Sequence, residues 1–534
     1  MIMKTRIITI GLLALLLSAG VLIAGCMTSN AAGDSSSLVP EVTKVSANAK
    51  ILKMADLSAI TSLDPAYAGV FITEKAAVTE PLVGANRDFT ITPQLAKSWN
   101  QTSPTTWEFY LRDDVKFHNG KPLTADAVKF SLDRIAGISA RDRTMMDFAS
   151  SRVINDHTIE VTTNNPNPIL PAVLHYSDMS IIHPDSLNAQ GTLTIPIGTG
   201  PMMYDSFDEQ TRIFAVKKNP EYWGGTVKLD GIVFTSIPDH NSRTLAIEKG
   251  DVDFTVDIPY NEMERVDALP GINIEKYLTP RVYRLIVNFD HTPFQDVRVR
   301  KAISLAINRT DIVNHVLYGV GGPAKGIFTP DMAWSNKNLD QLPYDPEQAK
   351  ALLAEAGYTD TDGDGIVEKD GQPFVVNLIA GNNRPGLPPM AETIGADLKA
   401  IGIQPRIEVM TSAAATDRLS AGSYDLNLIA ANIAMVPDPA YIVNNWYTTK
   451  GPDNNGHYKN ATLDAMIHDA SQTTDLKERY AKFNVIEADV NDYLPTIPIA
   501  DYGVAIVKKD TVTGYKFDPT AHDFRLDYNI FITG

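Results

Sequence analysis

The chain has one cysteine in 534 residues, and this number and its position limit how the fold can be stabilised. Cys26 directly follows an apolar run, residues 7–24, and precedes a stretch rich in Ser, Ala, Asn and Thr. One cysteine cannot form a disulfide within the chain, so the fold must be stabilised by packing alone. We therefore interpret Cys26 as a processing mark rather than as part of a core.

The start of the chain has the pattern of a secretory leader. Lys4 and Arg6 give it a positive start before the apolar run, and Leu22-Ile23-Ala24-Gly25-Cys26 resembles the lipobox at which lipoprotein leaders are cut. We expect Cys26 to become the lipidated N-terminus, joined to the folded body by a flexible tether. The alternative is an ordinary transmembrane anchor, since the run lies at the lower edge of the roughly 17–25 residues that span a bilayer.

Charge and composition narrow the class of protein. The chain has 64 Asp and Glu against 47 Lys and Arg, a formal net charge of −17, and such a surface repels phosphate backbones. We therefore expect no nucleic acid partner. A hydrophobic content of 44% and the lack of a second long apolar run predict a large globular body, which the leader would place outside the cytoplasm.

The pattern of apolar residues changes along the chain. Up to about residue 234, short β-type runs alternate with turns and occasional helices, which predicts a mixed α+β first half. Beyond it, helices and strands alternate, which predicts a parallel sheet with helices on both faces. The predicted helices are 124–135, 296–308, 310–317, 413–420, 463–470, 475–490 and one that starts at Asp345; the predicted strands are 374–380, 403–410, 425–431 and 498–507.

The search for catalytic motifs is negative. The chain has no His-Glu-x-x-His, no Gly-x-x-x-x-Gly-Lys and no Gly-x-Ser-x-Gly. We expect a protein that is not an enzyme.

The order of several short segments is more specific than any one of them. They are Leu63-Asp64-Pro65, Glu80-Pro81-Leu82, Leu95-Ala96-Lys97-Ser98-Trp99, Val115-Lys116-Phe117-His118-Asn119-Gly120, Ile197-Gly198-Thr199-Gly200-Pro201, Asn219-Pro220-Glu221-Tyr222-Trp223, Glu248-Lys249-Gly250-Asp251-Val252-Asp253 and Asp296-Val297-Arg298-Val299-Arg300-Lys301-Ala302. In this order and spacing the chain resembles the peptide/nickel solute-binding proteins of ABC importers, family five. The resemblance extends over about residues 51–530.

The resemblance implies an α/β fold of the periplasmic-binding-protein type two. Two lobes close around a ligand at a hinge, and an extra α+β domain is inserted in the first lobe. The expected boundaries are 1–25 for the leader, 26–50 for the lipidated Cys and tether, 51–83, 194–281 and 500–534 for lobe I, 84–193 for the inserted domain, and 282–499 for lobe II.

The resemblance also implies a function. We expect a lipid-anchored, extracytoplasmic monomer that needs no cofactor, captures short peptides and delivers them to the ABC permease in the membrane. Nickel or a nickel chelate is the alternative cargo. A sensor module without transport and an extracellular hydrolase are further alternatives, from other functional classes.

In peptide-binding relatives, a strand matching residues 426–439 lies beside the ligand. Those relatives carry a Trp seven residues before a Pro and, four before it, the Asp that binds the ammonium of the peptide; here these positions are Asn432 and Met435. Losing that carboxylate removes a charge-assisted hydrogen bond of about 1.5–3 kcal/mol. Either Asp438 takes its role, or the ligand is not an ordinary peptide. The candidate ligand-binding residues are Tyr67, Gly69, Val70, Phe71, Asn432, Ala434, Met435, Asp438 and Trp446.

A nickel cargo would need imidazole donors. His175, His183 and His457 are the candidates, although most histidines in a chain of this size are structural or exposed. With ordinary pKa values near 6.5, such binding would fall away below roughly pH 6.

One segment resembles the opening of a calcium loop. Asp360, Asp362 and Asp364 alternate ahead of a Gly, and Ile366 could offer its backbone carbonyl. The twelfth position, where such a loop has a bidentate Glu, is Gly371, while Glu368 is a weaker substitute. The alternatives are a bound Ca²⁺ and a polar helix-to-strand turn.

Overall fold

A computed structural model describes residues 49–67, 70–521 and 523–533. The leader, Cys26 and Gly69 lie outside the described residues. In this described part, no helix is both long and apolar enough to cross a membrane.

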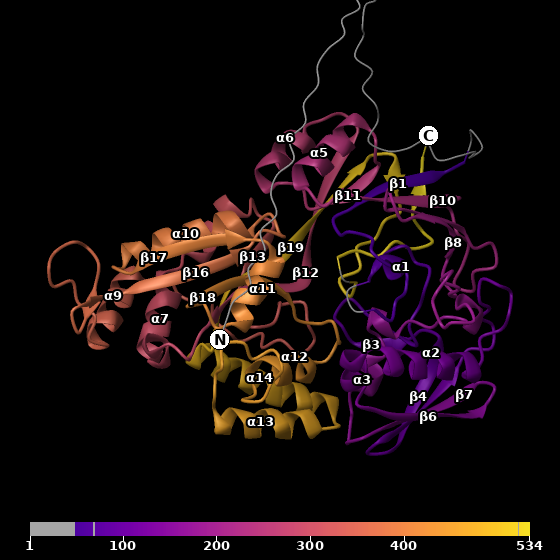
Figure 1. The fold of residues 1–534 in the computed structure, drawn as a ribbon, viewed down its shortest axis with the longest axis horizontal. Coiled ribbons are helices and arrows are strands. Elements are labelled where there is room, and N and C mark those ends of the chain that lie inside the picture. Colours follow the sequence, from indigo (N-terminus) through magenta and orange to yellow (C-terminus); the bar gives the residue numbers. More distant parts are fainter. Residues whose placement is uncertain (1–48, 68–69, 522, 534) are drawn as a thin grey trace, which may run out of the picture. The chain divides into compact units, whose positions relative to one another are not determined.

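A mixed sheet forms the centre of the fold (Figure 1). Its strand order is β17 (Gln404–Met410), β16 (Val375–Gly381), β18 (Leu426–Asn432), β12 (Ile272–Val287), β19 (Thr496–Lys509), β11 (Phe254–Val256), β1 (Ile51–Asp56), β10 (Gly231–Ser236), β9 (Ile213–Lys218) and β8 (Met202–Asp208), with β13 (Gly321–Pro323) on β19.

The sheet is parallel at two places and antiparallel between them. β16 runs parallel to β17 and β18, and β1 runs parallel to β10 and β11. β12 pairs antiparallel with β18 and β19, and β19 pairs antiparallel with β11. The predicted parallel sheet is therefore confirmed for β16–β18 but wrong beyond them, because two long strands run from one half of the sheet into the other.

The pairing of β12 with β19 is irregular where these strands pass from one half of the large sheet into the other. The register of β12 against β19 shifts between Leu278 and Val282, a stretch that contains Pro280, which has no N–H to donate. Opposite it, a Cβ on Gly503 would lie 2.5 Å from the backbone nitrogen of Gly321. Pro280 thus lies in an interruption of regular pairing at the place where a hinge is expected, and Gly503 lets β13 approach β19 closely. The domain boundaries themselves stay predictions.

A second, antiparallel sheet belongs to the predicted inserted domain. Its order is β4 (Ala96–Ser103), β5 (Thr106–Leu111), β7 (Thr158–Thr163) and β6 (Phe148–Asn155), and α2 (Ala125–Ile138) packs on it. As predicted, Thr124 caps α2, accepting from the Ala127 N–H at 3.4 Å, and Val128 and Leu132 point into a core of their own. The mixed α+β character of this segment is confirmed.

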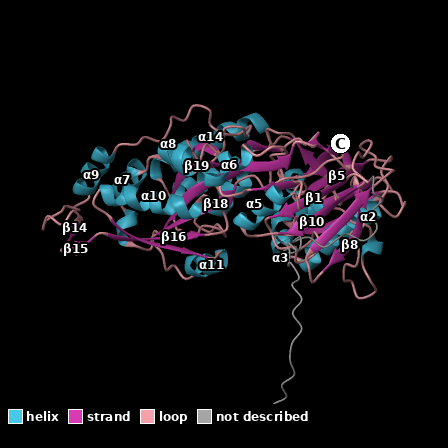
Figure 2. Cartoon of the chain, turned by 90° about the horizontal axis from the view of Figure 1, so that it is seen from above, coloured by secondary structure: helices cyan, strands magenta, loops and turns pink. Residues whose placement is uncertain are grey.

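Helices cover the half of the sheet that contains β16–β18. Figure 2 shows α10 (Leu387–Ala400) along β16–β18, and the two are in contact. The other helices of this half are α7 (Val297–Ala306), α8 (Arg309–Asp311) with a π-helical turn (Ile312–Val316), α9 (Pro346–Glu355), α11 (Ser412–Ser420), α12 (Pro439–Tyr447), α13 (Ala461–Gln472) and α14 (Leu476–Tyr493). The predicted N-cap Asp345 is confirmed, accepting from the Gln348 N–H at 2.9 Å.

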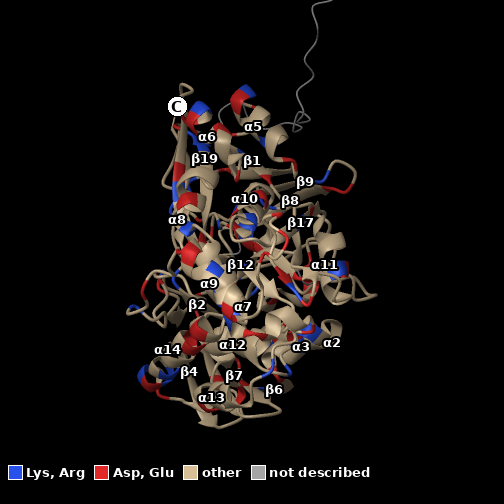
Figure 3. Ribbon diagram, turned by 90° about the vertical axis from the view of Figure 1, so that its left-hand side faces the viewer, with Lys and Arg blue, Asp and Glu red and all other residues tan. Residues whose placement is uncertain are grey.

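Short elements complete the described chain. They are α1 (Ile72–Lys75), α3 (Ala140–Met146), α4 (Leu170–Val173), α5 (His240–Lys249), α6 (Met263–Asp267), β2 (Val83–Ala85), β3 (Ile91–Pro93), β14 (Glu368–Lys369), β15 (Gln372–Pro373), β20 (Val512–Thr513) and β21 (Phe531–Ile532), besides 3₁₀ turns. Acidic and basic residues are interspersed along the helices that face the viewer in Figure 3, such as α9 and α14.

Candidate ligand-binding site

A pocket lies where the two halves of the large sheet, the inserted segment and the C-terminal segment come together. The cavity is small, about 10 Å³, and it is bounded by Glu74, His175, Tyr176, Ser177, Asn432, Met435 and Thr520. Glu74 belongs to α1, residues 175–177 follow α4, and Asn432 ends β18. The pocket therefore joins three of the sequence candidates, His175, Asn432 and Met435, which are far apart in the chain.

His175 is held in one orientation. Its side chain is buried, and its Nδ1 lies 3.1 Å from the Val83 carbonyl oxygen. Burial, reinforced by the positive charge of Arg525, lowers its pKa to about 4, so the ring is neutral at pH 7. The backbone of Val83 and the backbone of Thr520 are both hydrogen-bond partners of the ring, which fixes its orientation in the pocket.

Glu74 is the acidic side chain among those that line this pocket. Its carboxyl group is buried, and burial raises its pKa to about 7 against the opposing effect of Arg525, whose Nη1 lies 3.7 Å away. No sequence signal points to Glu74, because α1 has four residues and no motif surrounds it.

A basic group that is 40% exposed lies beside the pocket. Arg141 donates to the Tyr176 hydroxyl at 3.3 Å and to Asp178 at 3.1 Å, and its guanidinium lies 5.2 Å from the centre of the Tyr176 ring. Asp178 is fully buried, and burial, with the nearby Asp142, raises its pKa to about 8. Arg141 therefore contacts the pocket wall that Tyr176 forms, without lining the pocket itself.

The other candidates near α1 lie around the pocket rather than in it. Phe71 packs edge-on against Tyr176, with ring centres 6.3 Å apart. Val70 and Phe71 also line a neighbouring hollow with Lys75, whereas Tyr67 is 55% exposed. Ala434 is buried, and its N–H donates to the Asn432 side chain at 2.9 Å.

Asp438 and Trp446 are engaged elsewhere. Asp438 caps α12, accepting from the Ala440 N–H at 2.8 Å, and forms a buried ion pair with Arg479 at 2.8 Å. Arg284 covers the Trp446 ring, 3.2 Å from its centre. Neither residue lines the pocket, so Asp438 does not occupy the place of the missing acid.

The two remaining histidine candidates also lie apart from the pocket. His183 packs against Phe117 at 5.1 Å between ring centres, and its Nδ1 accepts from the Asp185 N–H at 3.0 Å. His457 is half exposed, with Nδ1 2.5 Å from an Asp290 oxygen.

A cluster of buried ion pairs lies between the two halves of the large sheet. Asp523 lies 2.7 Å from Arg281, 3.2 Å from Arg384 and 3.3 Å from Lys75, while Arg384 also reaches Asp257 at 3.5 Å. These buried charges connect the C-terminal segment to both halves of the sheet.

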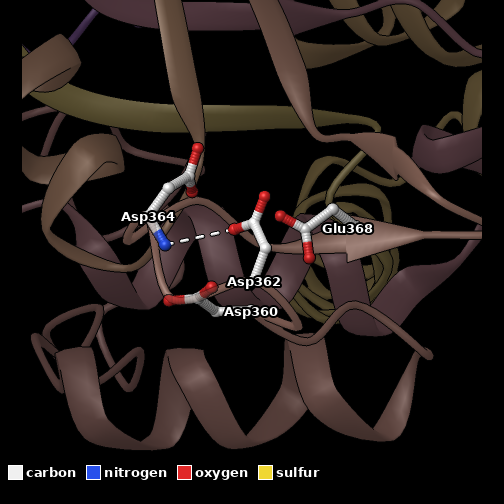
Figure 4. Close-up of side chains that lie close together, drawn as sticks. All are labelled: Asp360, Asp362, Asp364 and Glu368. Carbon is white, nitrogen blue, oxygen red and sulfur yellow. Dashed lines mark hydrogen bonds between the residues drawn. The ribbon is translucent and has the colours of Figure 1, made fainter.

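The acidic loop forms a compact group of carboxylates (Figure 4). Oxygens of Asp360, Asp362, Asp364 and Glu368 all lie within 4.8 Å of one another, so the cluster could hold a cation. Its carboxylates also fold the loop: Asp360 accepts from the Gly363 N–H at 2.7 Å, and Asp364 accepts from the Ile366 N–H at 2.8 Å. Glu368, which the sequence offered as a weaker substitute for the closing Glu of a calcium loop, lies with its carboxylate beside those of the three Asp residues.

Comparisons with known proteins agree with this architecture. The profile of "Bacterial extracellular solute-binding proteins, family 5 Middle" matches residues 90–454. The nickel-binding periplasmic protein of Escherichia coli is 27% identical over 84% of this chain and 88% of its own length. The glutathione-binding protein GsiB of Escherichia coli is 26% identical over 88% of this chain and 93% of its own.

Solved structures give the same result. NikA of Brucella suis, in complex with Fe(III)-EDTA, has a TM-score of 0.82 and 26% identity, covering 91% of this chain and all of that one. NikA of Staphylococcus aureus, in complex with Ni(L-His)₂, has a TM-score of 0.76 and 26% identity over the same shares. The predicted fold class is confirmed. The chain belongs to family 5 of the bacterial extracellular solute-binding proteins, and it is an extracytoplasmic substrate-binding protein of an ABC importer, not an enzyme.

Proposed function

We propose that the cargo of this binding protein is a nickel ion held in a small chelator. The sequence favoured peptides, with nickel as the alternative; the similar proteins named for nickel now favour the alternative. The observation that carries the proposal is the neutral, buried His175 in the pocket, with Nδ1 beside the Val83 carbonyl. A fixed imidazole of this kind is a common metal donor.

The opposite wall of the pocket supports the same cargo. At the position where peptide-binding relatives are expected to have an Asp for the peptide ammonium, this chain has Met435, which lines the pocket with Asn432. An apolar thioether does not replace that charge-assisted hydrogen bond of about 1.5–3 kcal/mol. A free peptide amino end would therefore be recognised poorly at this wall.

Calorimetry with three probes tests the proposal. The purified protein should bind a preformed complex of nickel with L-histidine, and bind nickel alone or L-histidine alone much more weakly, because the pocket supplies one imidazole rather than a full coordination shell. Tight binding of an unmetallated tripeptide, with no response to the nickel complex, would contradict it.

We further propose that the protein is a lipoprotein anchored through Cys26, which follows the lipobox-like segment. A Cys26→Ser variant should remain uncleaved or be released from the membrane, with unchanged affinity for cargo, because the tether precedes the folded body. Acyl labelling in cells checks this: a variant that still carried label and stayed fully membrane-bound would contradict the anchor.

We propose Ca²⁺ as the cation of the acidic loop, because four hard carboxylate donors converge there. With a Kd of about 0.1–1 mM, 10 mM Ca²⁺ should raise the free energy of unfolding by about 1.4–2.7 kcal/mol. Asp362→Asn should reduce this gain, while Asp370→Asn, which is exposed and outside the cluster, should keep it. Urea unfolding with and without Ca²⁺ measures both; an equal gain in the two variants would refute the site.

A further inference from the structure

The acidic side chain of the pocket, Glu74, comes from a different element than the sequence predicted. Glu74 and Met435 line the same pocket, but Met435 follows β18 whereas Glu74 lies in α1, more than 350 residues earlier in the chain. The position expected to hold an acid is apolar, and an acid not expected from the sequence reaches the pocket from another element.

The cations around Glu74 already have other carboxylate partners. Arg525 donates to Asp518 and lies no nearer than 3.7 Å to Glu74. Lys75 lies 3.1 Å from Asp56 and 3.3 Å from Asp523. The neighbouring positive charges are therefore shared with, or held by, other acids.

Glu74 has a long ion pair with Arg525, at 3.7 Å, and little further compensation. Its side chain is 9% exposed, and within the described residues its carboxylate accepts no hydrogen bond that meets ordinary geometry. A carboxylate removed from water in this way is costly unless a cation and hydrogen-bond donors are supplied to it. The open side from which they can come is the pocket.

We infer that Glu74 binds the positively charged group of the cargo, either the metal ion of a chelate or an ammonium. The inference rests on the proposed function for the choice of a metal ion, but the residue and the pocket are the same for both groups. With His175 on the adjoining wall, a metal ion would meet one carboxylate and one imidazole, a donor pair that suits nickel.

Several charged groups besides the cargo act on Glu74. They are Arg525, Lys75, Asp518 and Asp523. A comparison with a variant is therefore needed to isolate the contribution of Glu74 to cargo binding.

The test compares wild type with Glu74→Gln, Glu74→Asp and the control Glu221→Gln, whose carboxylate is exposed and paired with Lys116. Calorimetry at pH 8 uses the preformed nickel–L-histidine complex, a free-amine tripeptide and its N-acetylated form. Glu74→Gln should weaken binding of the cationic probe about 10- to 100-fold. Glu74→Asp should retain most of the affinity, and Glu221→Gln should match wild type.

Two results separate this inference from the proposed function. If only the free-amine peptide binds and Glu74→Gln weakens it, the nickel proposal fails and the role of Glu74 stands. If Glu74→Gln binds its cationic probe as tightly as wild type at pH 8, the role of Glu74 is overturned, whichever probe binds. Arg525 keeps Asp518 as its partner in Glu74→Gln, so the variant should fold, and circular dichroism checks that it melts close to wild type.

Discussion

Replacing Asp438 by Asn should cost about 3–5 kcal/mol of the free energy of unfolding, because it leaves a buried guanidinium without its counterion. The side chains of Asp438 and Arg479 are 9% and 3% exposed, and they meet at 2.8 Å. The same guanidinium donates to the carbonyls of Ser471 and Thr473, so it ties the link between α13 and α14 to the start of α12.

The substitution separates charge from helix capping. Asn is as good an N-cap as Asp, so the cap on α12 should survive and the loss should come from the ion pair. Urea unfolding measures the effect, and Asp114→Asn, in an exposed pair with Arg112, should cost no more than about 1 kcal/mol. A stable Asp438→Asn variant with lost cargo affinity would instead give Asp438 a direct role in binding.

Replacing His175 by Ala should weaken binding of the nickel–L-histidine complex at least about 100-fold, because losing even a residue that only orients a metal ligand costs about 10- to 100-fold in affinity. The matched control is His457→Ala: His457 is half exposed and outside the pocket, so this variant should bind like wild type. Calorimetry at pH 7.5 measures both. Unchanged binding in His175→Ala with a loss in His457→Ala would place the metal elsewhere.

The pH dependence of this donor differs from the sequence-based expectation. An ordinary imidazole would lose the metal below roughly pH 6, but burial lowers the pKa of His175 to about 4. Since the neutral ring is the metal-binding form, its contribution should hold down to about pH 5 and be lost as pH falls through 4. Any weakening of binding between pH 7 and 6 should therefore come from carboxyl groups such as Glu74, not from His175.

Local signals in the sequence were enough for many of the elements. Thr124 and Asp345 mark helix starts because a capping side chain and the turn it caps are neighbours in the chain. The strands β16 and β18 follow from short apolar runs bounded by turns. The antiparallel crossing of β12 and β19 did not follow, because the direction of pairing between distant strands leaves no local pattern.

The candidate site was predicted only in part, because contacts between residues that are distant in the chain leave no local pattern. Asn432, Met435 and His175 came from a resemblance and from residue chemistry, and they meet in one pocket. Glu74 could not be found, since its role depends on burial and on which acids hold Arg525 and Lys75. Likewise, that Asp438 is bound to Arg479 depends on the packing of α12 against α14, which the sequence does not report.

The central claim, that this importer protein carries a chelated nickel ion, is tested most directly by a native mass spectrum of the protein purified from its own host. The account predicts an adduct whose mass contains one nickel ion and a small chelator, which disappears on denaturation and is missing from His175→Ala. A series of metal-free adducts with the masses of short peptides, present equally in wild type and His175→Ala, would contradict it.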